Sequence, residues 1–321
     1  MPVCKGTNTQ TIAIDRQLQV LELAGAIGGW ITADLAASSL WPGKPNAMAY
    51  SYELLAAMVK KKRLQARPID GRGKVYVVSE AGVHFAESHG IETTNGLRWG
   101  RQPKGQAWMP PARFGHDLRA ARFMLFLSNA SVETLGPLIR GMPFDPEFAE
   151  VPQVNIAFDY EIQQQNANLF KRPDGLAVIR DRVFWVEVEA TRKDGEDMRL
   201  LCQTLLDISQ GNWIYVDIPG QPIEERREKP TDTIVVYPSV ASDRRGYRIS
   251  HEDRVCRALL RALEEQARAD DGAEQGRLLD SEARPLPRGM VRTYFVQETS
   301  PGKFVLPEHS TNLTDNTILD L

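Results

Sequence analysis

Residues 158–210 read FDYEIQQQNANLFKRPDGLAVIRDRVFWVEVEATRKDGEDMRLLCQTLLDISQ, and this stretch decides the fold of the larger part of the chain. Its pattern predicts a strand, a turn, a β-hairpin and then a helix. Successive side chains of a strand alternate between two faces, so Trp185, Glu187 and Glu189 should share one face. The short hairpin turn brings Asp174, at the head of the preceding strand, near Glu187. Three carboxylates are therefore expected together.

Clustered carboxylates repel one another unless a cation neutralises them, and hard oxygen ligands favour Mg²⁺ or Mn²⁺. A metal so held can polarise a phosphate and activate its bound water. Asp174, Glu187 and Glu189 are thus the predicted metal ligands and catalytic residues, and Lys193 or Arg192 could supply a nearby positive charge. The open alternative is a degenerate site kept for structure or interaction.

Strands and helices continue to alternate after this stretch. The pattern predicts a helix and two strands, then a second helix and a last strand, at 196–209, 213–218, 233–238, 251–269 and 291–297. Such alternation is typical of an α/β domain with a mixed sheet and helices on its faces. We place this domain at 113–300 and a tail at 301–321.

The first ninety residues predict a different architecture. Three helices come first, and Thr32 is expected to cap the second of them. RLQARPI and KVYVVS then read as a hairpin, and Ser79 caps a final helix. In the third helix Met48 and Tyr52 are expected to face inward and Ser51 outward. This order predicts a winged helix-turn-helix over 1–90.

Two basic runs flank this small domain. Seven basic residues lie between Lys60 and Lys74 against one acidic residue, and six lie between Arg98 and Arg122 against one. In a winged helix the third helix fits the major groove of DNA and the hairpin lies along a phosphate backbone. The predicted DNA contacts are Ser51, Lys60, Lys61, Arg67, Arg72, Lys74, Arg98 and Arg101. The alternatives are solvated charged faces, or a winged helix used only for protein contacts.

Composition narrows the class of protein further. The 321 residues are 42% hydrophobic, and no apolar run approaches the roughly 20 residues of a membrane span. The net charge of −3 gives no bulk attraction for nucleic acid, so DNA affinity must come from local patches. Three widely spaced cysteines and a polar N-terminus predict a cytoplasmic protein without disulfides or membrane contacts.

Residues 91–112 are rich in Gly, Pro and Arg, and they predict an inter-domain linker that Trp99 and Trp108 could pin onto a domain. His116 follows, at the head of a long helix. A histidine there could face the carboxylates as a base or phosphate contact, although such residues more often cap or pack.

The spacing of the acidic residues resembles that of a known nuclease superfamily. Pro173-Asp174, followed thirteen residues later by Glu187-Val188-Glu189 at the end of a hairpin and then by a helix, resembles the PD-(D/E)xK nuclease superfamily. Together with the winged helix and His116-Asp117-Leu118, the chain resembles the replication-relaxation family of plasmids and other mobile elements over roughly 16–238. One departure is Glu189, which stands where the superfamily has a lysine that stabilises charge at the phosphate.

The resemblance implies a mobile-element DNA-binding protein of plasmid replication, relaxation or transfer, with a second domain that binds and nicks DNA in a Mg²⁺- or Mn²⁺-dependent manner. The alternative is a non-catalytic winged-helix regulator whose nuclease-like domain serves dimerisation or partner binding. Under both hypotheses we expect double-stranded DNA and a second copy of the chain as partners.

Overall fold

The computed structural model describes residues 9–69, 73–101, 108–139, 154–165, 172–180, 182–189, 196–209, 216–217, 227–228, 230–238, 258, 292–307 and 311–312. The protein is a mixed α/β chain of two compact units. Unit 1 comprises Met1–Asn129 and Ala157–Gln164, and unit 2 comprises Ala130–Ile156 and Gln165–Leu321. Each unit is described by itself.

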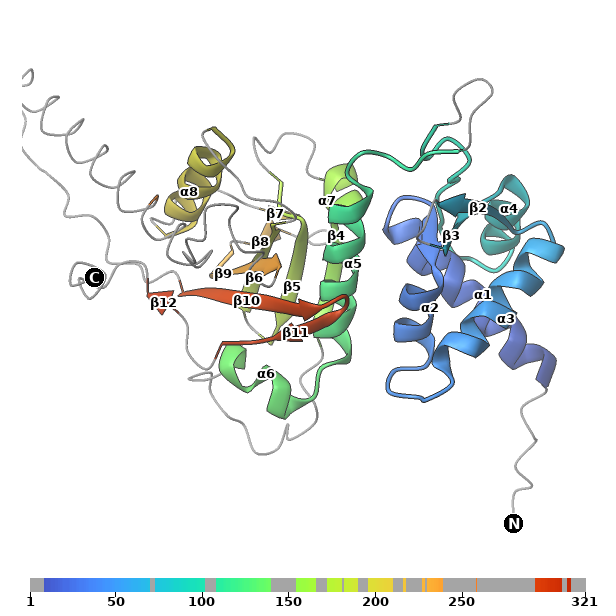
Figure 1. Ribbon diagram of the computed structural model, residues 1–321, viewed down its shortest axis with the longest axis horizontal. Coiled ribbons are helices and arrows are strands. Elements are labelled where there is room, and N and C mark those ends of the chain that lie inside the picture. The colour runs from blue at the N-terminus through green and yellow to red at the C-terminus, as the bar shows by residue number, and fades with distance from the viewer. Residues whose placement is uncertain are drawn as a thin grey trace, which may run out of the picture. The chain divides into compact units, whose positions relative to one another are not determined.

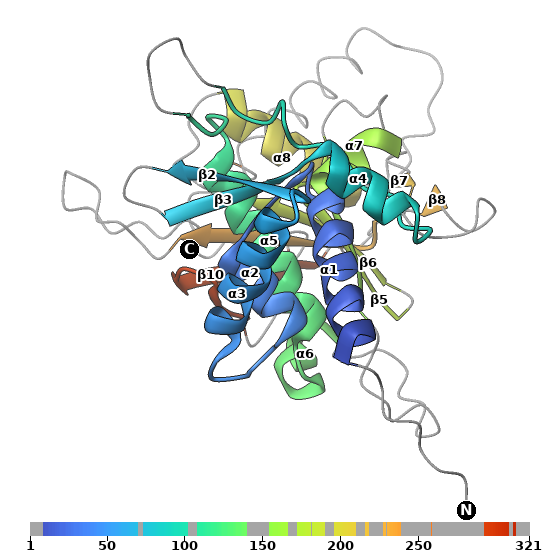
Figure 2. The ribbon, with the colours of Figure 1, turned by 90° about the vertical axis from the view of Figure 1, so that its right-hand side faces the viewer.

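Unit 1 combines helices with one small antiparallel sheet (Figures 1 and 2). Its sheet has the order β1-β3-β2, and the predicted hairpin of β2 and β3 is confirmed. The sequence did not predict the short strand β1, which pairs with β3. The elements are α1 (Thr9–Ala26), β1 (Trp30–Thr32), α2 (Ala33–Leu40), α3 (Ala47–Lys60), β2 (Leu64–Ile69), β3 (Gly73–Val78), α4 (Glu80–Glu87), α5 (Phe114–Asn129) and α7 (Asp159–Gln165).

Local chemistry explains where these helices begin and end. The chain leaves α1 through Gly28 and Gly29, whose φ angles of 94° and 88° suit glycine. Ser79 caps α4 as predicted, because its Oγ accepts a hydrogen bond from the Gly82 amide at 3.1 Å. Thr32 stands at the N-cap of α2 with extended backbone, but its side chain makes no capping hydrogen bond. Thr32 therefore occupies the predicted N-cap position, but the predicted hydrogen bond from its side chain is absent.

Helix α3 is rotated relative to the sequence-based expectation. Its buried residues are Ser51, Leu55 and Met58. Ser51 is fully buried and its hydroxyl donates to the Ala33 carbonyl oxygen at 2.6 Å, so it does not lie on the outward face. Tyr52 is 50% exposed and Met48 41%, although both were expected inside. A small hydroxyl side chain with a buried acceptor lets α3 pack closely on α2.

The segment assigned to a linker packs on unit 1. The Trp99 ring stacks on the Trp30 ring with centroids 5.0 Å apart and an interplanar angle of 17°, and Trp108 lies 5.4 Å from Trp99. The Gly96 amide also donates to the Val78 carbonyl oxygen at 2.9 Å. These contacts join the described part of 91–112 to the three-stranded sheet.

Unit 2 is built on a mixed sheet, as predicted. Its order is β11-β10-β9-β6-β5-β4, with β12 also paired to β10. Strands β5 and β6 are antiparallel, whereas β6, β9 and β10 run parallel to one another. The elements are α6 (Val132–Ile139), β4 (Val154–Phe158), β5 (Gly175–Ile179), β6 (Arg182–Val188), α8 (Glu196–Ser209), β7 (Val216–Asp217), β8 (Arg227–Glu228), β9 (Asp232–Pro238), β10 (Arg292–Ser300), β11 (Lys303–Val305) and β12 (Thr311–Asn312).

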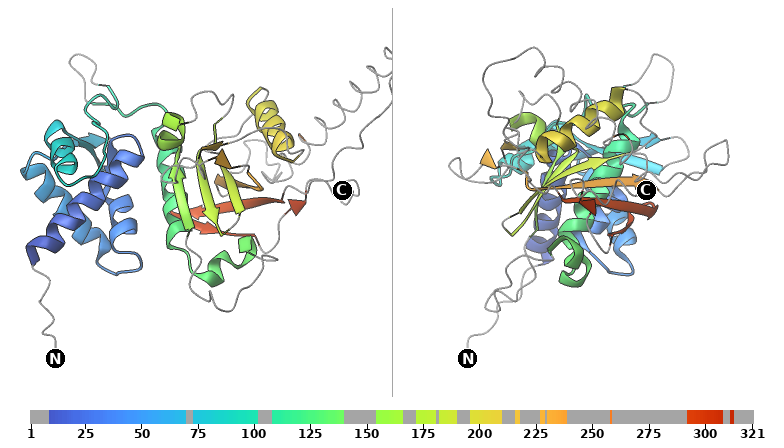
Figure 3. Two further views of the ribbon diagram at one scale, coloured as in Figure 1. Left: turned by 180° about the vertical axis from the view of Figure 1, so that it is seen from behind. Right: turned by 90° about the vertical axis from the view of Figure 1, so that its left-hand side faces the viewer.

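Figure 3 shows this sheet twisted, with α8 beside it. Helix α8 has the bounds that the sequence predicts. Strand β7 differs from expectation because it pairs with β8 in a separate two-stranded sheet. Strands β11 and β12, in the expected tail, instead pair with β10. The helix expected at 251–269 lies outside the described residues except for residue 258. Within the described ranges, every helix is too short or too polar to cross a membrane.

We expect Trp99→Ala to destabilise unit 1, because it removes the ring that covers Trp30. The free energy of unfolding should fall by about 2–4 kcal/mol. This is somewhat less than for truncation of a fully buried aromatic side chain, because Trp99 is only partly buried. Urea unfolding of the full chain measures it. Met109→Ala, which truncates a side chain that is 41% exposed, is the control. Equal stability of Trp99→Ala and wild type would show that 91–112 adds nothing to the fold.

Candidate functional site

The Asp174 carboxylate is held at the end of the β5–β6 hairpin. The ladder between the two strands runs from Ile179–Arg182 to Gly175–Val186, and Asp174 directly precedes its last pair. The Asp174 amide donates to the Val186 carbonyl oxygen at 2.9 Å, and Asp174 Oδ2 accepts from the Val188 amide at 2.8 Å. The end of the hairpin thus fixes the Asp174 carboxylate.

The Glu187 carboxylate is held by a tryptophan. Trp185 Nε1 donates to Glu187 Oε1 at 2.6 Å, and both side chains are almost wholly buried. Residues two apart on a strand share a face, so this bond confirms the predicted alternation along β6. A hydrogen bond to a charged acceptor is among the stronger ones in a protein interior. Trp185 therefore orients the carboxylate.

Glu189 follows directly after β6. It is completely buried, and its amide donates to the Val236 carbonyl oxygen of β9 at 2.7 Å. The hydrogen bond continues the pattern of the parallel β6–β9 pair by one residue. Because the chain stays paired with β9, alternation assigns Glu189 to the same side as Glu187. This is the position at which the PD-(D/E)xK pattern has lysine.

The carboxylates of Asp174, Glu187 and Glu189 are donors of the kind that a hard cation prefers. In the part of the chain that the structure describes, no three His, Cys, Asp or Glu side chains are grouped so that they could hold a metal ion. Lys193 and Arg192 lie outside the described residues. Metal binding by Asp174, Glu187 and Glu189 stays a prediction.

His116 belongs to unit 1, in the first turn of α5. Its Nδ1 lies 3.2 Å from Asp117 Oδ1. Arg113 approaches the same Asp117 oxygen at 3.5 Å and also Asp159 Oδ2 of α7 at 3.5 Å. A chain of charged groups thus ties α5 to α7. The catalytic role of His116 stays a prediction.

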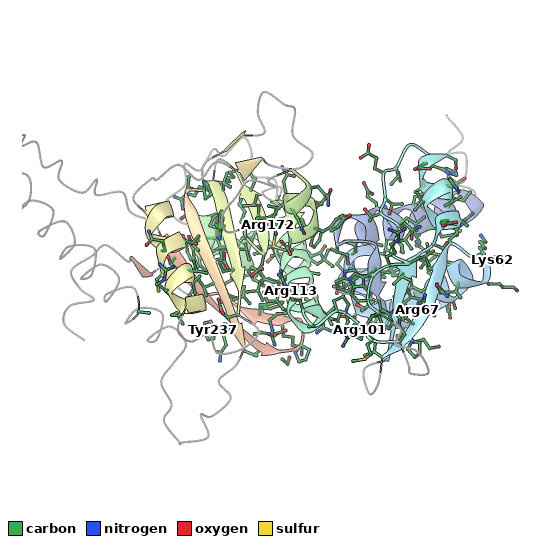
Figure 4. All side chains as sticks on the ribbon, turned by 90° about the horizontal axis from the view of Figure 1, so that it is seen from above. Lys62, Arg67, Arg101, Arg113, Arg172 and Tyr237 are labelled. Carbon is green, nitrogen blue, oxygen red and sulfur yellow. The ribbon has the colours of Figure 1, made fainter. Side chains whose placement is uncertain are left out.

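Most of the predicted DNA contacts that the structure describes are exposed. They lie at the end of α3, on β3 and in the segment after α4 (Figure 4 labels Arg67, Arg101 and Lys62 of this unit). The exposed residues are Lys60, Lys61, Lys74, Arg98 and Arg101. Two described residues are exceptions, since Ser51 is buried and Arg67 is partly buried, and Arg72 lies outside the described residues.

The hairpin does not present all of its basic side chains on one side. Arg67 stands opposite Val75, so Arg67 and Lys74 emerge from opposite faces of the β2–β3 pair. Arg67 is partly buried, and its Nη2 donates to Gln65 Oε1 at 2.8 Å. Lys74 is therefore the better placed of the two for a phosphate group.

Further basic residues of the two runs also have structural partners. The Arg63 guanidinium lies 3.2 Å from the centroid of the Phe85 ring and donates to Gln17, and burial lowers its pKa. Arg122 Nε contacts Asp34 Oδ2 at 2.7 Å and so joins α5 to α2, while Arg113 is paired as described above. The basic surface is therefore smaller than the sequence suggests.

Sequence reasoning missed Trp185 as a functional residue, although its alternation with Glu187 was the signal. The ion pair of Arg113 and Asp159 could not be predicted from a local pattern, because the two residues lie far apart in the sequence.

No protein-family model matches the chain, and no curated protein or solved structure is significantly similar to it.

We expect Trp185→Phe to lower the free energy of unfolding by about 1.5–3 kcal/mol, the usual range for a hydrogen bond to a charged group. The reason is that Glu187 would stay buried without its indole donor. The double-mutant cycle with Glu187→Leu, which removes the acceptor, measured by urea unfolding, separates this bond from the change in packing. A coupling energy near zero would show that the bond does not orient Glu187.

Proposed function

We propose that the chain is a DNA-binding protein whose first unit is a winged helix-turn-helix. The observation that carries this proposal is the exposed face of α3, which runs into Lys60 and Lys61 and lies in the same small fold as the β2–β3 hairpin with Lys74. Further support comes from the order of helices and strands in unit 1, which resembles that of a winged helix, with β1 as the third strand of its sheet.

The physical argument is one of shape and local charge. A single α-helix fits the major groove, and lysines beside it pair with phosphate oxygens on either side. Since the whole chain has a net charge of −3, these local side chains must supply the attraction. The lysines at the end of α3 also stabilise its C-terminus through the helix dipole.

For unit 2 we propose a nuclease-like domain of PD-(D/E)xK type. Support comes from the hairpin that holds Asp174 on the Val188 amide beside Glu187, the helix α8 that follows it, and the mixed sheet. The resemblance to the replication-relaxation family extends this proposal to plasmid replication, relaxation or transfer, with a second copy of the chain as partner. Mg²⁺ or Mn²⁺ is the cation that such acids would bind.

The second candidate function is a regulator that binds an operator but does not cleave it. Two observations favour it. Glu189 is buried where a nuclease of this type needs a cation, and the Glu187 carboxylate already accepts a hydrogen bond from Trp185. Unit 2 would then serve dimerisation or partner binding.

DNA binding through unit 1 is tested by charge neutralisation. The variant Lys60→Gln/Lys61→Gln/Lys74→Gln should bind a short duplex more weakly and with a flatter salt dependence, since each lost phosphate contact removes about 0.9 from the slope of log K against log salt. Fluorescence anisotropy titrations at several salt concentrations measure both. Lys303→Gln, which neutralises an exposed lysine of unit 2, should leave the slope unchanged. If the triple variant keeps the wild-type slope, this surface is not the DNA interface.

The two candidate functions differ in their response to metal. If the acids of unit 2 bind Mg²⁺ or Mn²⁺, the ion should raise the melting temperature by linkage, and Asp174→Asn should abolish the rise. Glu133→Gln, at an exposed acid of α6, is the matched control. A nuclease should also nick supercoiled plasmid in the presence of metal and lose this activity in Asp174→Asn. If neither ion changes the melting temperature and the protein does not nick plasmid, the nuclease hypothesis is wrong and the regulator remains.

A further inference from the structure

Resting on the proposed DNA-binding function, we propose that α3 selects its DNA site by contact with the 5-methyl groups of thymine, and that Glu53 adds a preference for cytosine. Side chains of α3 would then discriminate among bases, whereas the exposed lysines at its end would not. Lysine contacts with phosphate carry no sequence information directly.

The orientation of α3 determines which of its side chains can reach a groove. Ser51, Leu55 and Met58 face the interior. On the opposite side, exposed residues recur every three or four positions, which places them in one stripe along the helix. The stripe consists of Ala49, Glu53, Ala56 and Lys60, and Met48 and Tyr52 form its edge.

The stripe is unusual for a helix that reads bases. Guanine is most often read by Arg or Lys and adenine by Asn or Gln. Every residue of α3 is described, and the helix contains no Arg, Asn or Gln. Its single lysine, Lys60, is the last residue and adjoins Lys61 and Lys62, where a phosphate contact is the simpler role. Only Asn46, at the N-cap, could read adenine.

The stripe presents apolar side chains and the carboxylate of Glu53. Alanine and other apolar groups contact the thymine methyl, which projects into the major groove, and a glutamate accepts a hydrogen bond from the cytosine amino group. The short side chains of Ala49 and Ala56 let the helix approach the base edges closely. Two larger side chains add apolar contacts: the flexible Met48, which is 41% exposed, and the flat ring of Tyr52, which is 50% exposed.

An apolar helix face could also bind a protein. Duplex DNA is the better occupant because the stripe ends in Lys60, Lys61 and Lys62, three adjacent exposed cations, and complementary charge of this kind suits a phosphate backbone. A second copy of the chain or another protein would need carboxylates at matching positions, whereas every duplex carries phosphates along its backbone.

The experiment starts by selecting duplexes from a randomised pool with the full-length protein. Selected sites should contain thymines whose replacement by deoxyuridine, which lacks only the methyl group, weakens binding about fourfold per contacted methyl. Deoxyuridine at flanking positions of the same duplexes should have no effect. Affinities are measured by anisotropy at one fixed salt concentration.

Protein variants assign the effect to α3. In Met48→Ala/Tyr52→Ala the deoxyuridine penalty should shrink, whereas in Ile12→Ala, which truncates a side chain of α1 that is 37% exposed, it should persist. Glu53→Gln should shift the preferred base at one position from cytosine to adenine by about tenfold, because glutamine pairs with adenine. Circular dichroism melts of each variant exclude unfolding as the cause.

The outcomes separate the two levels of the proposal. If no duplex is retained at any sequence, both the proposed function and this inference fail. If duplexes bind but their affinity is unchanged by deoxyuridine, or if the selected sites are read through guanine, the DNA-binding function stands and the thymine readout is wrong. Association of α3 with a second copy, seen as dimerisation that Met48→Ala/Tyr52→Ala abolishes, would likewise overturn it.

Discussion

The hydrogen bond from the Ser51 hydroxyl to the Ala33 carbonyl oxygen holds one face of α3 on α2, and the DNA-binding surface that we propose for unit 1 depends on which face is held. With Ser51, Leu55 and Met58 buried, the opposite side of the helix must carry Ala49, Glu53 and Ala56 to solvent. A different rotation would bury Tyr52 and expose Ser51, and it would present another set of groups to a groove. One buried hydroxyl thus decides what the helix can recognise.

A comparable constraint acts in unit 2, where the register of the β5–β6 hairpin decides which acids can meet. Pairing of Gly175 with Val186 brings Asp174 to β6, where its carboxylate accepts from the Val188 amide next to Glu187, and a slip of one residue would turn Glu187 to the other face of the sheet. Arg180, in the turn, has a φ of 57°, the left-handed conformation that tight hairpin turns require. Trp185 then orients Glu187 from the same face.

Much of the fold could be predicted because it follows from local periodicity. Alternation along β6, the bounds of α8 and the Ser79 cap all depend on residues close in sequence. The errors arose where distant residues decide the outcome. Ser51 is inside because Ala33 offers an acceptor, and the described part of residues 91–112 is packed because Trp99 meets Trp30. Strand β11 pairs with β10 although its sequence is short and partly polar, so the predicted tail is partly sheet. In the candidate site, the placement of Asp174 at the end of the hairpin followed from spacing, whereas its role and that of Glu187 stay predictions. Arg67 was assigned without regard to the face from which it emerges.

The central claim of this account is that unit 1 meets DNA through α3 and the β2–β3 hairpin. Amide hydrogen exchange of the full chain, with and without a bound duplex, measures this most directly, because it reports every backbone segment without a substitution. The account predicts slower exchange in the peptides that cover α3 and the hairpin, with the helix α6 of unit 2 unchanged. Protection confined to unit 2, with α3 and the hairpin exchanging as in the free protein, would contradict it.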